Sequence, residues 1–294
     1  MLLCEVCPFA FHEDRMDEQD VWFRRFFGEE YLLFDEHPDT AQEVAFISEA
    51  LRLTPRMRLL DLCCGYGRHG VPLARQGFHV VGLDLSPVLL KEARKRQKAD
   101  GRPKRKSRES RVASRESKAQ GQTRDPRPVT RDSTGGGLHL VRGDVRHLPF
   151  AGGFDAAISM FTSLGYFDDE AENFRVLKGI AGVLKPGGSI LIETVNRDAI
   201  VRHFRPVQVF RPTGMTVIEE RQFDLVSGRS RVDVTVIRDG QETRLHHSIR
   251  VYAFTELEML LMANGLNVEG VWGDFQGGEF SWNTASMIVL ARKV

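Results

Sequence analysis

The stretch from Met57 to Asp84, MRLLDLCCGYGRHGVPLARQGFHVVGLD, constrains the fold more than any other part of the chain. An apolar run precedes Gly65 and Gly67, as expected where a strand ends in a sharp turn. A short helical pattern then ends at Gly77, and a second apolar, β-branched run follows. The stretch therefore predicts a strand, helix and strand of a parallel α/β sheet.

Charged residues in this unit point to an adenosine-containing cofactor. Asp84 lies nineteen residues after Gly65, at the expected end of the second strand, where a carboxylate can bind ribose hydroxyls. Asp61 would repel a pyrophosphate but suits the ammonium and sulfonium groups of S-adenosylmethionine. Since the glycines from Gly65 to Gly70 also fit G-x-G-x-x-G, an NAD-dependent oxidoreductase is an alternative.

The segments LLDLCCGYGRHG and VVGLDLS resemble the class I S-adenosylmethionine-dependent methyltransferases, above all bacterial members that act on small molecules. The resemblance covers about residues 20–98 and 138–294, including the turn LKPGG. It implies methyl transfer from S-adenosyl-L-methionine to a small-molecule acceptor. In that family the glycine loop holds the methionine part, and acids after later strands hold the ribose and the adenine. The resulting candidates for cofactor binding are Asp61, Cys63, Gly65, Gly67, Arg68, Asp84, Leu85, Asp144, Val145, Met160 and Tyr31.

The pattern of the whole chain predicts a Rossmann-like, doubly wound seven-stranded sheet formed by residues 38–195 and 255–294. Alternating apolar and polar residues in 196–254 predict an antiparallel β cap inserted into this domain. Residues 1–37 form an N-terminal segment, in which aromatic residues at helical spacing predict either a packed helix or a lid.

Shorter signals predict where individual helices begin. Ser86 followed by Pro87 is typical of a helix start. Thr255 and Glu258 are spaced as a capping box for a helix that ends at Gly265.

Residues 99–137 differ from the rest of the chain in composition. They contain 11 Lys and Arg residues against 5 Asp and Glu residues, with no aromatic residue. Because such a segment buries little apolar surface, we expect a disordered basic insertion. Its charge also leaves open an RNA methyltransferase that uses this loop, although stacking groups for bases are missing.

Methyl transfer from a sulfonium requires mainly alignment of the acceptor and exclusion of water, so no strong catalytic motif is expected. Tyr166 follows the expected fourth strand, and Asn196 and His203 follow the fifth. These three residues are candidates for contacts with the substrate. The loop FTSLGY lacks an N-P-P-Y type motif, which disfavours methylation of DNA adenine or of protein glutamine.

The composition narrows the class of protein further. The net charge of the 294-residue chain is +1, which by itself suggests neither nucleic acid nor membrane as a partner. The four cysteines do not complete a zinc site, so we expect no metal and reduced thiols in a cytoplasmic protein. The segment MDEQDVWFRRFF reads as the beginning of the ordered protein, which suggests that Met16 rather than Met1 is the native start.

Overall fold

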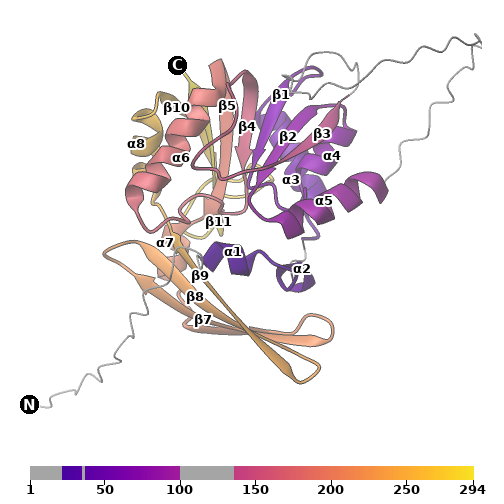
Figure 1. The fold of residues 1–294 in the computed structure, drawn as a ribbon. Helices are drawn as coiled ribbons and strands as arrows, with labels where there is room; N and C mark the ends of the chain where they lie inside the picture. The colour runs from indigo at the N-terminus through magenta and orange to yellow at the C-terminus, as the bar shows by residue number, and fades with distance from the viewer. Residues whose placement is uncertain (1–21, 35–36, 100–135) are drawn as a thin grey trace, which may run out of the picture.

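The computed structural model describes residues 22–34, 37–99 and 136–294, and within these residues the chain forms two sheets and the helices around them (Figure 1). The larger sheet has seven strands in the order β10-β11-β5-β4-β1-β2-β3. Its strands are β1 (Arg58–Leu62), β2 (His79–Asp84), β3 (Gly137–Arg142), β4 (Phe154–Ser159), β5 (Leu184–Val195), β10 (Leu266–Trp272) and β11 (Ser286–Lys293).

The strand directions are those of a doubly wound α/β sheet with one reversed strand. Strands β3, β2, β1, β4 and β5 pair in parallel, whereas β11 runs antiparallel to both β5 and β10. The order changes direction at β1, so the carboxyl ends of β1, β2 and β4 surround one crevice. The predicted Rossmann-like, seven-stranded sheet is therefore confirmed.

Apolar residues on both faces of the sheet explain why helices cover it on both sides. In β1, Leu60 and Leu62 belong to one buried cluster, which includes α6 and α8. Leu59 points to the other face and belongs to the cluster that includes Ile47 of α3 and Leu73 of α4. This alternation follows from the two-residue period of a strand. The helices are α3 (Thr40–Ala50), α4 (Gly70–Arg75), α5 (Pro87–Ala99), α6 (Glu170–Val183) and α8 (Phe254–Met262).

Local signals predicted one helix start correctly and another wrongly. The Ser86 hydroxyl accepts a hydrogen bond from the Leu89 nitrogen at 3.2 Å, so it caps α5 as predicted. The expected capping box of Thr255 and Glu258 is wrong, because α8 begins at Phe254. Glu256 instead accepts a hydrogen bond from the Ala253 nitrogen at 2.7 Å.

The smaller sheet is the antiparallel cap that the sequence predicted between β5 and α8. Its strands are in the order β6-β7-β8-β9, after the short helix α7 (Arg197–Arg202). Long hydrogen-bonded pairing of β7 with β8 and of β8 with β9 makes it a continuous twisted ribbon (Figure 1). The cap strands are β6 (Val207–Phe210), β7 (Met215–Asp224), β8 (Arg229–Arg238) and β9 (Gln241–Arg250).

Two short aromatic helices, α1 (Trp22–Phe26) and α2 (Tyr31–Phe34), lie between the cap and the large sheet (Figure 1). Trp22, Phe23 and Phe26 are buried, and α1 packs against β9. The aromatic stripe therefore joins the two sheets. The rest of the N-terminal segment and residues 100–135 of the basic insertion lie outside the described residues, as does the expected start at Met16. No helix among the described residues is long and apolar enough to cross a membrane.

Candidate active site

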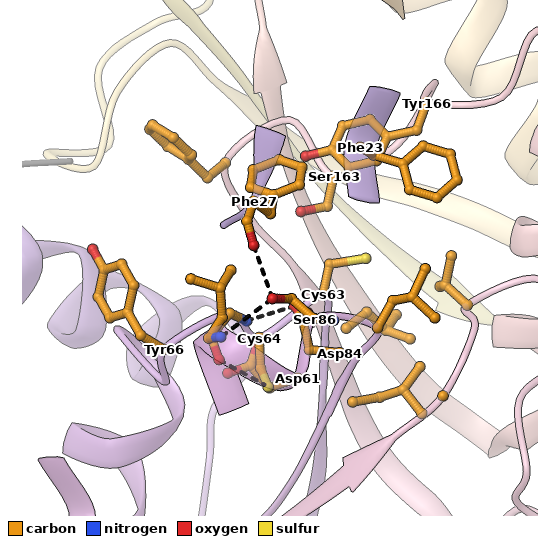
Figure 2. Close-up of a pocket in the computed structure, with 18 of the residues that line it drawn as sticks. Phe23, Phe27, Asp61, Cys63, Cys64, Tyr66, Asp84, Ser86, Ser163 and Tyr166 are labelled. Carbon is orange, nitrogen blue, oxygen red and sulfur yellow. Dashed lines mark hydrogen bonds between the residues drawn. The ribbon is translucent and has the colours of Figure 1, made fainter. Parts of the chain in front are cut away.

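A first cavity of about 220 Å³ lies at the carboxyl ends of β1, β2 and β4, where an α/β sheet of this order binds its ligand (Figure 2). The glycine loop after β1 forms its floor, and aromatic residues of α1 and of the loop after β4 lie opposite. The expected cofactor residues on its wall are Asp61, Cys63, Gly65, Arg68, Asp84, Leu85, Asp144, Val145, Met160 and Tyr31.

Gly67 is the exception among the expected cofactor residues, because it does not line the cavity. Its φ is +78°, and a Cβ there would lie 2.8 Å from Val71 Cγ2. Gly67 is thus required for the turn and for packing of α4 rather than for the cavity wall. Gly65 also has positive φ, at +53°, but it does line the cavity.

Asp84 closes β2 and organises the loop around it. Its Oδ2 accepts a hydrogen bond from the Gly65 nitrogen at 2.8 Å, and its Oδ1 accepts one from the Ser86 nitrogen at 2.7 Å. Burial raises the pKa of Asp84, while these backbone donors oppose that rise. Each oxygen keeps a further lone pair, so the carboxylate can still accept bonds from two adjacent hydroxyls.

Asp61 is a buried carboxylate with an unsatisfied oxygen. Its side chain is 2% exposed, and Oδ2 is buried without a hydrogen-bond partner. Burial, helped by the charge of Asp84, raises the pKa of Asp61 to about 7. The Gly70 backbone N–H and the Arg68 charge oppose that rise. A buried acceptor of this kind at the wall of the first cavity fits a cationic ligand group such as the ammonium of a methionine.

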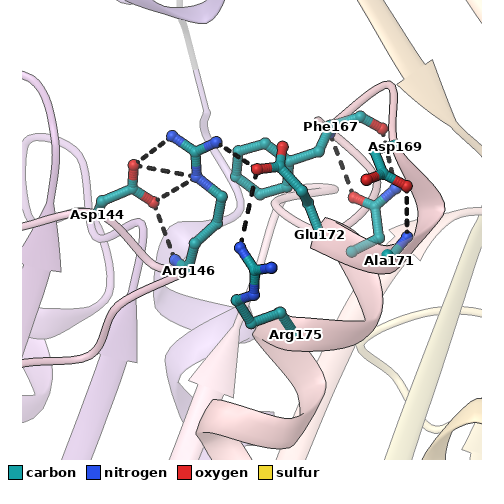
Figure 3. Close-up of polar contacts among 8 residues, drawn as sticks. Asp144, Arg146, Phe167, Asp169, Ala171, Glu172 and Arg175 are labelled. Atoms are coloured by element: carbon teal, nitrogen blue, oxygen red, sulfur yellow. Dashed lines mark hydrogen bonds and ion pairs between the residues drawn. The ribbon is translucent and has the colours of Figure 1, made fainter.

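Asp144 follows β3 and is engaged by its neighbour Arg146 (Figure 3). Both carboxylate oxygens accept hydrogen bonds from the guanidinium, the shortest at 2.7 Å, and Arg146 also pairs with Glu172 of α6 at 2.9 Å. These bonds lower the pKa of Asp144 against the opposing effect of burial. A bond from Asp144 to an adenine amino group would therefore share an oxygen with Arg146.

Arg68 reaches the first cavity from the end of the glycine loop. Its Nη1 pairs with Glu43 of α3 at 2.7 Å, and its guanidinium lies over the ring of Phe161 at 5.0 Å. Glu43 also bonds His69 Nε2 at 2.7 Å, so one buried acid orients both residues. Burial lowers the pKa of His69, with the bond to Glu43 opposing it.

A second cavity of about 570 Å³ adjoins the first and lies between the cap and the large sheet. Its wall includes Glu219 and Arg221 of β7, His247 of β9, and Glu193 of β5. Glu219 and Arg221 form an ion pair with each other. The cavity is thus lined by both sheets and by the aromatic helices.

The two cavities meet at four residues, and all four are aromatic: Phe27, Tyr31, Phe161 and Tyr166. The rings of Phe27 and Tyr166 are stacked, with centroids 5.8 Å apart, and Phe27 contacts Tyr31 edge-on at 5.1 Å. The Ser86 hydroxyl donates to the Phe27 carbonyl at 2.8 Å, which joins the aromatic segment to the first cavity (Figure 2). We call these four residues the aromatic junction.

The candidate substrate residues separate into two groups in the structure. Tyr166 belongs to the aromatic junction, and His203 lines the second cavity. Asn196 lines neither cavity, so the expectation that it contacts substrate is not supported. Its side chain is 1% exposed, caps α7 through the Asp198 nitrogen at 3.0 Å, and donates to the Ser281 carbonyl at 2.7 Å.

Sequence reasoning missed Glu43 and Glu193 as buried charges of this region. Both have a recognisable signal, because Glu43 is one helical turn before Ile47 on the inward face of α3, and Glu193 interrupts the apolar run of β5. It also made no use of His247, whose pKa burial lowers to about 4 and whose Nδ1 is buried without a partner. Among the described residues, no group of three or more His, Cys, Asp or Glu side chains is arranged to hold a metal ion.

The sheet order, the reversed last strand and the crevice after β1 define the fold class of the S-adenosylmethionine-dependent methyltransferases. The family model described as "Methyltransferase domain" matches residues 34–234. The chain belongs to this family, and the predicted enzyme class is confirmed.

Curated relatives are similar over most of their length. The chain is 27% identical over 247 residues to dTDP-3-amino-3,4,6-trideoxy-alpha-D-glucopyranose N,N-dimethyltransferase of Streptomyces venezuelae, covering 81% of this chain and 88% of that protein. It is 24% identical over 266 residues to the cypemycin N-terminal methyltransferase of a Streptomyces species, covering 85% and 88%.

Solved structures share the fold at lower identity. The CcbJ methyltransferase of Streptomyces caelestis has a TM-score of 0.68 at 18% identity, over 88% of this chain and 90% of that chain. CalS10 of Micromonospora echinaspora, solved with S-adenosylmethionine bound, has a TM-score of 0.58 at 20% identity, over 90% and 95%. The cofactor is S-adenosyl-L-methionine, which decides against the NAD-dependent alternative.

Proposed function

We propose that the enzyme transfers the methyl group to an amine nitrogen of a small molecule that binds in the second cavity. The observation that carries this proposal is the aromatic junction, since every residue shared by the two cavities has a π face. The relatives named as amino sugar N,N-dimethyltransferases support an amine acceptor as well.

Positive charge moves from the cofactor to the acceptor during the reaction. S-adenosylmethionine carries its methyl group on a positively charged sulfonium, and transfer to a neutral amine leaves the charge on nitrogen. Aromatic faces attract cations by about 0.5–2 kcal/mol each, depending on how far the site excludes water. Phe27, Tyr31, Phe161 and Tyr166 would therefore stabilise the charge on both sides of the transfer.

We further propose that the first cavity holds the cofactor through the residues expected from the sequence. Asp84 would accept hydrogen bonds from the ribose hydroxyls, and the unsatisfied Oδ2 of Asp61 would pair with the ammonium. Arg68, oriented by Glu43, would bind the carboxylate of the methionine part. Asp144 would receive the adenine amino group beside Arg146.

The test is methyl transfer from labelled S-adenosylmethionine to matched pairs of acceptors. One pair is dTDP-3-amino-3,4,6-trideoxy-alpha-D-glucopyranose and its analogue with a hydroxyl in place of the amine. We expect label in the amine and at least about 100-fold less in the hydroxyl analogue, because a neutral hydroxyl is a far weaker nucleophile than an amine. Label that enters only hydroxyl compounds across a panel of such pairs would disprove N-methylation.

An RNA acceptor is a weaker proposal, supported only by the basic composition of residues 99–137. Deleting 100–135 distinguishes the two proposals, since we expect methyl transfer to the small amine to persist. We also propose that the enzyme acts in the cytoplasm, which the free thiols of Cys63 and Cys64 support.

A further inference from the structure

Glu193 is a buried carboxylate on the wall of the second cavity, and its hydrogen-bond partners are neutral. The side chain is 6% exposed. Its Oε1 accepts from the Ser286 hydroxyl at 2.8 Å, and its Oε2 accepts from the Phe161 nitrogen at 2.6 Å. Within the part of the chain that the structure describes, no Lys, Arg or His side chain forms an ion pair with Glu193.

The two charged groups that act most strongly on Glu193, Arg68 and Glu43, are paired with each other. Arg68 exerts a favourable field on Glu193, but its ion pair is with Glu43, whose own charge acts in the opposite direction. The other acid of the cavity, Glu219, is paired with Arg221. The Glu193 charge is consequently the one carboxylate charge on the described wall of the second cavity without a salt bridge.

Hydrogen bonding alone does not account for a carboxylate at this position. A glutamine could accept from the Phe161 nitrogen through its oxygen and donate to the Ser286 hydroxyl through its amide. It would do so without desolvating an ion, which costs several kcal/mol when the ion has no partner. A cation supplied by a ligand would offset that cost.

The bond between Glu193 and Phe161 fixes where such a cation would lie. Phe161 and Thr162 adopt left-handed conformations, with φ values of 59° and 52°. The loop is held in this strained form by the side chain of Glu193, by its carbonyl, which accepts from the Thr162 nitrogen at 3.1 Å, and by Thr162 Oγ1, which accepts from the Val195 nitrogen at 3.0 Å. A cation paired with Glu193 is therefore close to a residue of the aromatic junction.

We propose that Glu193 binds the acceptor by pairing with its protonated amine and then takes the ammonium proton onto its carboxylate, which leaves the neutral nitrogen with its lone pair beside the aromatic junction for methyl transfer. The inference rests on the proposed function, because it names the group that recognises the amine. It makes Glu193 an acceptor-binding residue that discriminates by charge, and it explains an ionisable residue inside the apolar run of β5.

The test compares two ligands of the same shape that differ in charge, choline and 3,3-dimethylbutan-1-ol. Both are titrated by ligand-detected NMR into the full chain saturated with S-adenosylhomocysteine. We expect the unaltered protein to bind choline at least 10-fold more tightly than 3,3-dimethylbutan-1-ol. In Glu193→Gln we expect choline affinity to fall at least 10-fold, which is about 1.4 kcal/mol, while dimethylbutanol changes less than 2-fold.

Two variants serve as controls for charge and for hydrogen bonding. Ser286→Ala removes one donor to Glu193 but leaves the charge, and Glu220→Gln removes an exposed acid of β7 that lines neither cavity. We expect both to retain choline affinity within about threefold. Thermal unfolding of Glu193→Gln shows whether the Phe161 loop and the fold are retained.

Two results would overturn the inference: equal affinity of the unaltered protein for choline and dimethylbutanol, or unchanged choline affinity in Glu193→Gln. The first does not depend on any variant folding. If the enzyme methylates amines and either result is obtained, the proposed function is retained and the role of Glu193 in it is rejected. A different pair of results would disprove the proposed function and not the role of Glu193. In that case Glu193→Gln loses the preference for choline, but the unaltered enzyme methylates only hydroxyl compounds.

Discussion

The carboxylate of Asp84 accepts a hydrogen bond from the backbone nitrogen of Gly65 at 2.8 Å, across the first cavity's floor. The same side chain therefore shapes the glycine loop and offers lone pairs to a ligand. Asp84→Ala should lower the affinity for S-adenosylmethionine at least about 100-fold, because two bonds to a charged group contribute about 1.5–3 kcal/mol each. Isothermal titration calorimetry measures this.

A matched control for Asp84 is Asp198→Ala on α7, an acid that is more than half exposed and away from both cavities. We expect its cofactor affinity to stay within about twofold of normal. Near-normal binding by Asp84→Ala would contradict the assigned cofactor site.

The buried charge of Asp61 predicts a pH-dependent cost to stability in the cofactor-free enzyme. Because folding raises its pKa from 3.8 to about 7, the folded state binds the proton more tightly, and stability is lost as pH rises through that window. Asp61→Asn should therefore be more stable than the unaltered protein at pH 8, with the advantage smaller by about 2–3 kcal/mol at pH 5. Urea unfolding at the two pH values measures the difference, and an advantage independent of pH would refute it.

Asn196 is predicted to matter for stability rather than for acceptor chemistry. Asn196→Ala removes the cap of α7 and the hydrogen bond to the Thr284 carbonyl, while the Ser281 carbonyl loses one of its donors and keeps those from Thr284. We expect a loss of about 2–4 kcal/mol in the free energy of unfolding, measured by chemical denaturation. The KM for the acceptor, measured where the variant is fully folded, should change less than twofold, and a large rise would restore Asn196 as a contact.

Tyr166 tests whether the aromatic junction acts through its ring or through its hydroxyl. Burial raises the pKa of Tyr166, so the phenol stays protonated and is not expected to act as a base. Tyr166→Phe should retain kcat within about threefold, whereas Tyr166→Leu should lower it about 10-fold through loss of the π face. Steady-state kinetics with an amine acceptor decide this, and equal losses in both variants would favour a role for the hydroxyl.

Sequence patterns were sufficient to predict the large sheet because the residues that specify its turns and strands are close together in the sequence. The glycines after β1, the acid at the end of β2 and the apolar runs each specify a turn, a strand end or a buried strand. The alternation of apolar and polar residues within 196–254 likewise predicted the cap, and β8 shows it most clearly. The predicted capping box of Thr255 and Glu258 was wrong because capping patterns of Ser, Thr and Glu fit helix starts that differ by one or two residues. The packing of α8 decides at which residue the helix begins.

The acids of the site were predictable because they lie at or just beyond the carboxyl ends of strands. Asp61 and Asp84 lie in the last two residues of β1 and β2, Asp144 lies just beyond β3, and all three line the first cavity. The pairing of Asp144 with Arg146 depends on side-chain geometry in the folded loop (Figure 3). Asn196 also follows a strand, yet its contacts to residues 281–284 depend on a loop far along the chain, which no local pattern reveals.

The insertion of β6–β9 between β5 and α8 has a consequence for how acceptor preference can change during evolution. The large sheet is closed by the pairing of β11 with β5 whatever length of chain connects β5 to α8. Residues of the inserted ribbon, such as Arg221 and His247, can be exchanged without altering the pairing of the seven strands. The cap, which lines the second cavity, can thus change in sequence without disturbing the seven-stranded sheet, at which the methyl donor binds.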